Sequence, residues 1–92
     1  LFNLMKEVEI DGQKVKIAST VDAVGLFCPI PVVKLKIGME KVGLNQVIEL
    51  LADDPGVLED LPAWCKETNN KLLSLSKNQC GVFIAYIEKQ KE

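Results

Sequence analysis

Residues 47–52 form an almost continuous apolar run that contains one charged side chain, Glu49. Such a run is typical of a strand that is mostly buried in a sheet. On each side of it lies a segment whose apolar residues recur at helical spacing. With 92 residues, the chain is long enough for one hydrophobic core and too short for two. These features predict a single domain in which helices pack against a sheet.

The first helix is predicted over residues 29–42. Pro29 and Pro31 lie in its first turn, where a proline removes no intrahelical hydrogen bond. Gly38 is unfavourable inside a helix by about 1 kcal/mol relative to alanine, which indicates close backbone packing at this position. One apolar face of this helix is formed by Val32, Leu35, Met39 and Val42.

The second helix is predicted to end near Asn69, and two starts fit the sequence. Asp54 can cap the helix, with Pro55 in the first turn. Alternatively, Asp60 can cap it, with Pro62 in the first turn, and a kink at Pro62 would allow both. One side of this helix is expected to carry Leu58, Leu61, Cys65 and Thr68.

An Asp11-Gly12 pair between alternating polar and apolar residues predicts a β-hairpin over residues 8–17, because these residues accept the positive φ of a two-residue turn. The remaining strands are predicted over residues 16–22, 71–76 and 80–88. The last strand is expected to divide its side chains between two faces, with Phe83, Ala85 and Ile87 on one and Val82, Ile84 and Tyr86 on the other. The polar tail from residue 89 is expected to fray.

The order of elements after the hairpin is β-α-β-α-β-β. Two helices with one apolar stripe each cannot cover both faces of a four-stranded sheet. The predicted fold is therefore α+β, a two-layer α/β sandwich with a mixed four-stranded sheet and both helices on one face. Residues 1–14 are predicted to be an N-terminal extension or linker that can form the hairpin, and residues 15–92 the main domain. Leu1 leaves open a trimmed leader, a segment of a longer protein, or a native start at Met5.

All 11 basic residues are lysines, and the net charge is -2. Arginine is the preferred side chain for bidentate contacts with phosphate and guanine, so direct nucleic-acid binding is not expected. No apolar run approaches the roughly 20 residues that cross a membrane. Cys28, Cys65 and Cys80 are irregularly spaced and odd in number, which does not predict a disulfide framework. The sequence therefore favours a protein of the reducing cytoplasm.

Cys28-Pro29-Ile30-Pro31 places a thiol at the predicted N-cap of the first helix, directly after a strand. The thiolate is the reactive form of cysteine, and the positive end of the helix macrodipole stabilises it by about 0.3–1 kcal/mol at an exposed site. The two prolines remove backbone donors, and Ile30 keeps its own. We predict a modest activation of Cys28, with Lys34 as a candidate to assist if its side chain folds back over the helix end. The alternative is a small buried hydrophobic residue.

Residues 21–31, Val-Asp-Ala-Val-Gly-Leu-Phe-Cys-Pro-Ile-Pro, closely resemble the signature of the TusA/SirA-like family of small sulfur-carrier proteins. In that signature, a strand that ends in Asp precedes Gly-Leu-x-Cys-Pro-x-Pro. A second block agrees at similar spacing, with Ala-Asp-Asp-Pro at residues 52–55 and Asp-Leu-Pro-Ala-Trp-Cys at residues 60–65. The resemblance covers about residues 16–88. It implies the two-layer β-α-β-α-β-β sandwich of the C-terminal domain of translation initiation factor 3.

The resemblance also implies that Cys28 carries a persulfide and relays sulfane sulfur between proteins, with Gly25, Pro29 and Pro31 as supporting motif residues. The implied partners are a sulfur donor, either a cysteine desulfurase or a rhodanese-like protein, and a protein acceptor. Ile30 stands where relays for tRNA modification usually have Glu, so no particular pathway is implied. The family includes domains attached to oxidoreductases and rhodaneses, which allows the chain to be part of a larger fusion protein.

Two other functions fit the same residues. The Cys28 turn can be a rigid helix start in a non-catalytic docking or regulatory module, or a thiol redox switch with Cys80 or Cys65. We expect Cys65 to be buried and structural. Cys80 is expected to open the last strand, either as a resolving thiol or as an ordinary strand residue. Asp53 and Asp54 fit a strand end, a turn and a helix cap, and since the chain has no histidine, neither a metal nor a cofactor is expected.

Overall fold

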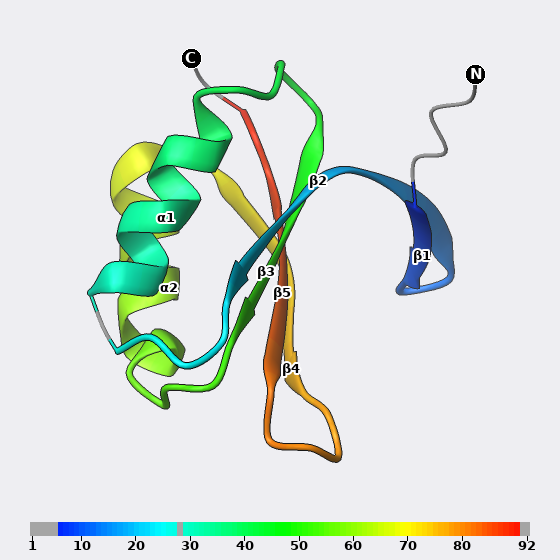
Figure 1. Ribbon diagram of the computed structural model, residues 1–92. Helices are drawn as coiled ribbons and strands as arrows, with labels where there is room; N and C mark the ends of the chain where they lie inside the picture. Colours follow the sequence, from blue (N-terminus) through cyan, green and yellow to red (C-terminus); the bar gives the residue numbers. More distant parts are fainter. Residues whose placement is uncertain (1–5, 28, 91–92) are drawn as a thin grey trace, which may run out of the picture.

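The structure is a computed structural model of the chain, and it describes residues 6–27 and 29–90. Five strands form one sheet in the order β1-β2-β3-β5-β4, in which β2 and β3 are parallel and the other neighbours antiparallel. Both helices lie on the same face of this sheet (Figure 1). The predicted α+β sandwich is therefore confirmed. Its elements are β1 (Lys6–Ile10), β2 (Gln13–Ala23), α1 (Ile30–Met39), β3 (Val47–Ala52), α2 (Val57–Thr68), β4 (Lys71–Lys77) and β5 (Phe83–Glu88).

The predicted hairpin is present, and it enlarges the sheet. Asp11 and Gly12 form its turn with φ of 52° and 81°, the left-handed region that both central residues of such a turn require. β2 is one continuous strand of 11 residues, which pairs with β1 along its first half and with β3 along its second. The sheet therefore has five strands instead of four. The predicted division of the chain after residue 14 falls inside β2.

The hydrophobic core lies between the sheet and the two helices. β3 has its predicted bounds, and Ile48 and Leu50 on its helical face are at most 1% exposed. From the helices, Leu35 and Leu61 are fully buried in the same cluster. Leu58 was expected on the buried side of α2 but is 49% exposed, because α2 turns Val57 toward the core in its place. Among the described residues, no helix is long and apolar enough to cross a membrane.

The helix boundaries differ from the prediction by a few residues. α1 begins after Pro29, so that Pro29 and not Cys28 is its N-cap, and it ends at Met39 instead of residue 42. α2 follows Gly56, so neither Asp54 nor Asp60 caps it. Helix ends depend on a few backbone hydrogen bonds, which sequence patterns define poorly.

Pro62 lies inside α2, where it leaves one turn of the helix without a backbone donor. The predicted end of α2 is confirmed, because Asn69 adopts the left-handed conformation, with φ of 61°.

The C-terminal segment is hydrogen-bonded to α1, which corrects the expectation of a frayed tail from residue 89. The Lys89 ammonium donates to the carbonyls of Met39 and Val42 at 2.8 and 2.9 Å. These carbonyls lie at the C-terminal end of α1, where a cation is favoured by the helix dipole. The Lys89 backbone also exchanges hydrogen bonds with Asn45 and Gln46. Lys89, which lies outside every helix and strand, thus supplies hydrogen-bond donors to the C-terminal end of α1.

Replacing Lys89 with methionine is expected to lower the free energy of unfolding by about 1–2 kcal/mol, because two carbonyls lose their donor while the aliphatic stem is kept. The matched control is Lys41→Met, since Lys41 is exposed near the same helix end and makes no side-chain hydrogen bond to a described residue. Urea denaturation of the three proteins measures the difference. Equal midpoints for the two variants would show that general charge, and not the hydrogen bonds of Lys89, stabilises this end.

Candidate functional site

The two sequence blocks of the motif meet at one edge of the sheet. β2 and β3 run parallel and end side by side, with Ala23 paired with Ala52. The connections that follow them therefore leave the sheet at the same edge, the lower end of the molecule in Figure 1. There the Gly25 backbone N–H donates to Asp53 Oδ1 at 2.9 Å. Asp53 thus links the β3–α2 connection to the loop that precedes Cys28, a contact that the sequence analysis did not foresee.

The loop after β2 is also closed by its own hydrogen bonds. The Leu26 N–H donates to the Ala23 carbonyl at 3.2 Å, and the Asp22 carboxylate accepts the Val24 N–H at 3.1 Å. Gly25 has φ of 88°, a conformation that glycine adopts without the steric cost of a Cβ. The direction in which the chain leaves β2 is therefore set by three hydrogen bonds and one glycine.

Cys28 lies outside the described residues, and the carbonyls of its two neighbours accept hydrogen bonds from the first turn of α1. The Ile30 N–H donates to the Phe27 carbonyl at 2.9 Å, and the Val33 N–H donates to the Pro29 carbonyl at 3.1 Å. The donor that the sequence analysis left to Ile30 is therefore already used. Of the effects considered for activating a thiol here, the helix dipole and the Lys34 side chain remain.

The other predicted site residues at this edge take different positions. Pro31 is fully buried and packs the first turn of α1 into the core. Pro29 is exposed. Lys34 does fold back, since its ammonium donates to the Asp22 carbonyl at the end of β2, at 3.2 Å. The structure thus brings Gly25, Pro29, Pro31 and Lys34 together around the start of α1, and their roles in function stay predictions.

Cys80 was predicted to open the last strand. Instead, it lies in the connection between β4 and β5. It is exposed, and its N–H donates to the side chain of Asn78 at 2.9 Å. β5 begins only at Phe83, because Gly81, with φ of 85°, turns the chain first. This connection lies at the same edge of the sheet as the end of β3, since Phe83 pairs with Ala52. A resolving role for Cys80 stays a prediction.

Cys65 is buried, as predicted, with 3% of its surface exposed. Burial raises the pKa of its thiol to about 11, because the charged thiolate loses its hydration. At neutral pH only about one molecule in ten thousand would carry the thiolate at this position. Cys65 is therefore a structural side chain of the core and a poor nucleophile.

The pKa of Cys65, raised to about 11 in the folded protein, predicts a loss of stability in alkali. An unfolded cysteine ionises at a lower pH, so between the two pKa values the thiolate forms only in the unfolded chain, and unfolding is favoured as pH rises. At about pH 10.5 the ionisation of Cys65 in the unfolded chain lowers the free energy of unfolding by about 2 kcal/mol relative to about pH 8. Urea denaturation of the wild type and of Cys65→Ala at both pH values isolates the effect from other groups. An equal loss in both proteins would contradict the assignment.

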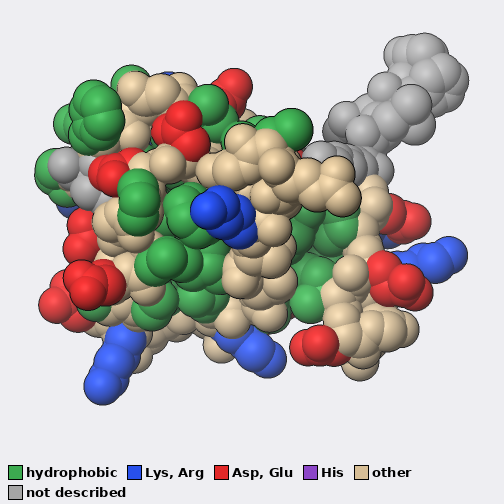
Figure 2. Space-filling view, turned by 90° about the horizontal axis from the view of Figure 1, so that it is seen from below, with side chains coloured by type: hydrophobic (Ala, Val, Ile, Leu, Met, Phe, Trp, Pro, Cys, Tyr) green, Lys and Arg blue, Asp and Glu red, His purple; other side chains and the backbone are tan. Residues whose placement is uncertain are grey.

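The surface around the start of α1 is unusually apolar. Phe27 is 76% exposed, and Val24, Ile30 and Leu58 are each exposed by more than 40%. These residues belong to the β2–α1 loop and to the first turns of the two helices. Figure 2, which looks at this end, shows hydrophobic side chains at the surface with acidic side chains among them. Exposed acidic residues in these segments and directly beside them are Asp22, Asp53, Glu59 and Asp60.

Asp53 and the exposed apolar side chains are the features that sequence reasoning missed. Asp53 was assigned to a strand end and turn, although its place after a buried parallel strand was a signal that it would face the neighbouring loop. Exposure of Phe27 and Leu58 depends on the exact helix starts and has no local signal. Among the described residues, no group of three or more Cys, Asp or Glu side chains is placed to hold a metal ion.

Comparison with known proteins gives one consistent result. A family model described as "Sulfurtransferase TusA" matches residues 19–89. The sulfur carrier protein TusA of Allochromatium vinosum is 38% identical over 68 residues, which cover 74% of this chain and 88% of the relative. A "putative sulfur carrier protein" of Archaeoglobus fulgidus is 38% identical over 72 residues, which cover 76% of this chain and 94% of the relative.

Two further similarities concern length and fold. A "putative sulfur carrier protein" of Aquifex aeolicus is 40% identical over 80 residues, which cover 87% of this chain but 40% of the relative. The crystal structure of a SirA-like protein from Desulfitobacterium hafniense superposes with a TM-score of 0.70 at 24% identity, and covers 79% of this chain and 99% of that one. The second similarity shows a common fold.

Proposed function

Because this chain belongs to the TusA sulfurtransferase family, we propose that it is a cytoplasmic sulfur carrier. Cys28 accepts sulfane sulfur as a persulfide from a donor protein and passes it to a protein acceptor. The observation that carries this proposal is the construction of the loop that contains Cys28. Gly25, which precedes Cys28, is hydrogen-bonded to Asp53, and Pro31, which follows Cys28 in the sequence, is buried. Both ends of this short segment are therefore fixed, while Phe27 and Pro29 beside the cysteine are exposed.

The chemistry requires a thiolate and an accessible partner. The Cys28 thiolate attacks the outer sulfur of the donor's persulfide, the sulfur–sulfur bond of the donor breaks, and the donor cysteine leaves as a thiolate. A new sulfur–sulfur bond forms on Cys28, with no net oxidation or reduction. Transfer to the acceptor repeats the step in the other direction. Neither step needs a general base or a metal, in keeping with a chain that has no histidine.

Transfer between two proteins needs a surface on which each partner can dock. Phe27 and Ile30 lie on either side of Cys28 in the sequence and are 76% and 45% exposed, so they offer apolar contact to a partner on this segment. Asp53 and Asp60 are exposed in the adjoining segments. We expect the donor, a cysteine desulfurase or a rhodanese-like protein, to present apolar and basic side chains around its own cysteine.

Loading with sulfur tests the proposal. The reduced protein is incubated with a cysteine desulfurase and cysteine, or with a rhodanese and thiosulfate, and its intact mass is measured. We expect a gain of one sulfur atom, about 32 Da, that disappears on treatment with a thiol reductant. Absence of the adduct with either donor would favour a docking module. A loss of two hydrogen atoms on mild oxidation, without an adduct, would favour a thiol redox switch.

A further inference from the structure

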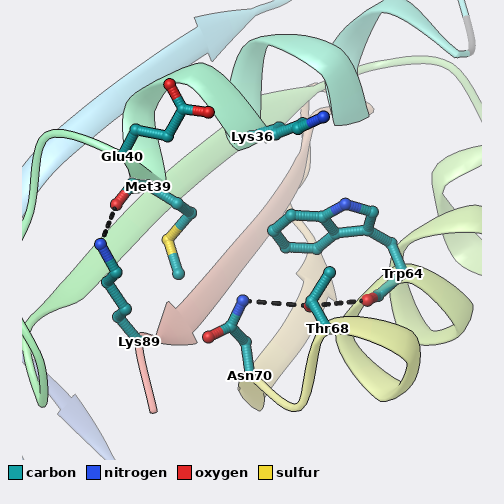
Figure 3. A pocket seen from close by; sticks show the side chains of 7 residues that line it. All are labelled: Lys36, Met39, Glu40, Trp64, Thr68, Asn70 and Lys89. Atoms are coloured by element: carbon teal, nitrogen blue, oxygen red, sulfur yellow. Dashed lines mark hydrogen bonds between the residues drawn. The ribbon is translucent and has the colours of Figure 1, made fainter. Parts of the chain in front are cut away.

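A groove lies between the two helices, on the half of the helical layer away from the Cys28 loop. Its volume is about 310 Å³, and it is lined by the C-terminal halves of α1 and α2 together with Asn70 and Lys89 (Figure 3). The start of α1 is about 15 Å from its end, the length of a ten-residue helix. The groove is therefore separate from the site proposed for sulfur transfer. Its volume is at the lower end of the range for small-molecule sites, about 300–1,000 Å³.

The inner wall of the groove is apolar. Met39 from α1 is 4% exposed and lies at the base, while Trp64 from α2 is half-buried and presents its indole ring along one side. A flat ring can stack against an indole, and a thioether adapts its shape to an aromatic neighbour. The wall therefore favours the planar apolar body of a small ligand.

The polar groups of the groove have unused donors. The Lys89 ammonium has three N–H groups and gives two of them to the carbonyls of Met39 and Val42. The Asn70 side chain gives one N–H to Thr68 Oγ1 at 3.0 Å and accepts the Gln90 N–H at 3.1 Å, which leaves one N–H. The Lys36 ammonium makes no hydrogen bond or ion pair with a described residue. The groove thus offers donors that match an anion.

The charges at the rim fit the same ligand. Lys36 extends toward the indole of Trp64, whereas the carboxylate of Glu40 is directed away from it (Figure 3). We propose that this groove binds a small aromatic carboxylate, with its ring against Trp64 and Met39 and its carboxylate at Lys36. A charge-assisted hydrogen bond beside an apolar wall is stronger than the same contact in open solvent.

The test uses 3-phenylpropanoate as the probe and the indole N–H resonance of Trp64 as the reporter. The chain has one tryptophan, so this resonance needs no assignment in ¹H–¹⁵N correlation spectra. We expect a saturable shift with an apparent Kd of about 1 mM or below. The neutral analogue 3-phenylpropanamide is expected to bind about three- to tenfold more weakly, because it lacks the charge that Lys36 recognises.

Two variants locate the carboxylate. Lys36→Met removes the ammonium, keeps the aliphatic stem and is expected to weaken 3-phenylpropanoate about three- to tenfold. Lys41→Met, on an exposed lysine that does not line the groove, should bind as the wild type does. No saturable shift, or equal affinities of carboxylate and amide, would overturn the proposal. Equal affinities of Lys36→Met and Lys41→Met for 3-phenylpropanoate would also overturn the proposal. The result is independent of sulfur loading, because the binding assay uses no sulfur donor.

Discussion

Cys28→Ser is expected to abolish the sulfur adduct completely. A serine hydroxyl is not ionised at neutral pH and does not form a stable bond to sulfane sulfur, so neither attack on the donor nor storage of the sulfur is possible. Because Cys28 precedes an exposed helix start, this substitution should leave the fold unchanged. Intact-mass measurement after incubation with the donor shows the loss, and the urea denaturation midpoint shows that the variant is folded.

The other two cysteines are the matched controls. Cys80→Ser changes an exposed thiol in the β4–β5 connection and should retain the adduct. Cys65→Ala removes a thiol whose pKa is raised to about 11 by burial, and it should retain the adduct as well. Alanine is chosen there because a serine hydroxyl in the core would lack a partner. An adduct that persists in Cys28→Ser and disappears in Cys80→Ser would place the sulfur on Cys80 and contradict this proposal.

Gly38→Val is expected to lower the free energy of unfolding by about 2–3 kcal/mol. A Cβ at this position would lie 2.9 Å from Ile48 Cδ1 and 2.9 Å from Val21 Cγ2, closer than carbon atoms pack. Ile48 is fully buried, so relief requires α1 to move away from the sheet. Valine and glycine differ little in helix propensity, so the effect measures packing. Urea denaturation provides the measurement. The close approach of α1 to Ile48 and Val21 also confirms the prediction that Gly38 marks close packing of the helix backbone.

Gly43→Val is the control for this variant. A Cβ at Gly43 would lie 3.5 Å from Gln46 Oε1, an ordinary contact with a flexible exposed side chain. Its backbone has no positive φ, so we expect a change below about 1 kcal/mol. Similar losses in the two variants would mean that backbone entropy of glycine, and not the approach of α1 to the sheet, explains the result.

Side-chain periodicity predicted the elements well because it reflects which face of each element is buried. The run at residues 47–52 became β3, and Phe83, Ala85 and Ile87 face the core as the alternation in β5 indicated. The Asp11-Gly12 turn was also predictable, because its φ values are a local property of two residues. The placement of both helices on one face of the sheet was predictable because each helix has a single apolar stripe.

Positions that depend on a few hydrogen bonds were predicted less well. Neither carboxylate expected to cap α2 does so, and Pro62 lies inside a helix whose Leu61 and Cys65 are packed against the core. Cys80 was predicted to open the last strand, whereas Asn78 and Gly81 turn the chain there. Such turns are decided by competition between local bonds of similar energy.

The sequence by itself determined the class of fold, the family motif and the identity of the candidate nucleophile, because these reside in residues close together along the chain. Only the tertiary structure decided that Asp53 is hydrogen-bonded to Gly25, that Lys89 closes α1, and that Lys36 faces Trp64 across a groove. Each of these arrangements brings together segments that are far apart along the chain. Their formation depends on the parallel register of β2 and β3 and on the packing of two helices on one sheet, which no local pattern encodes.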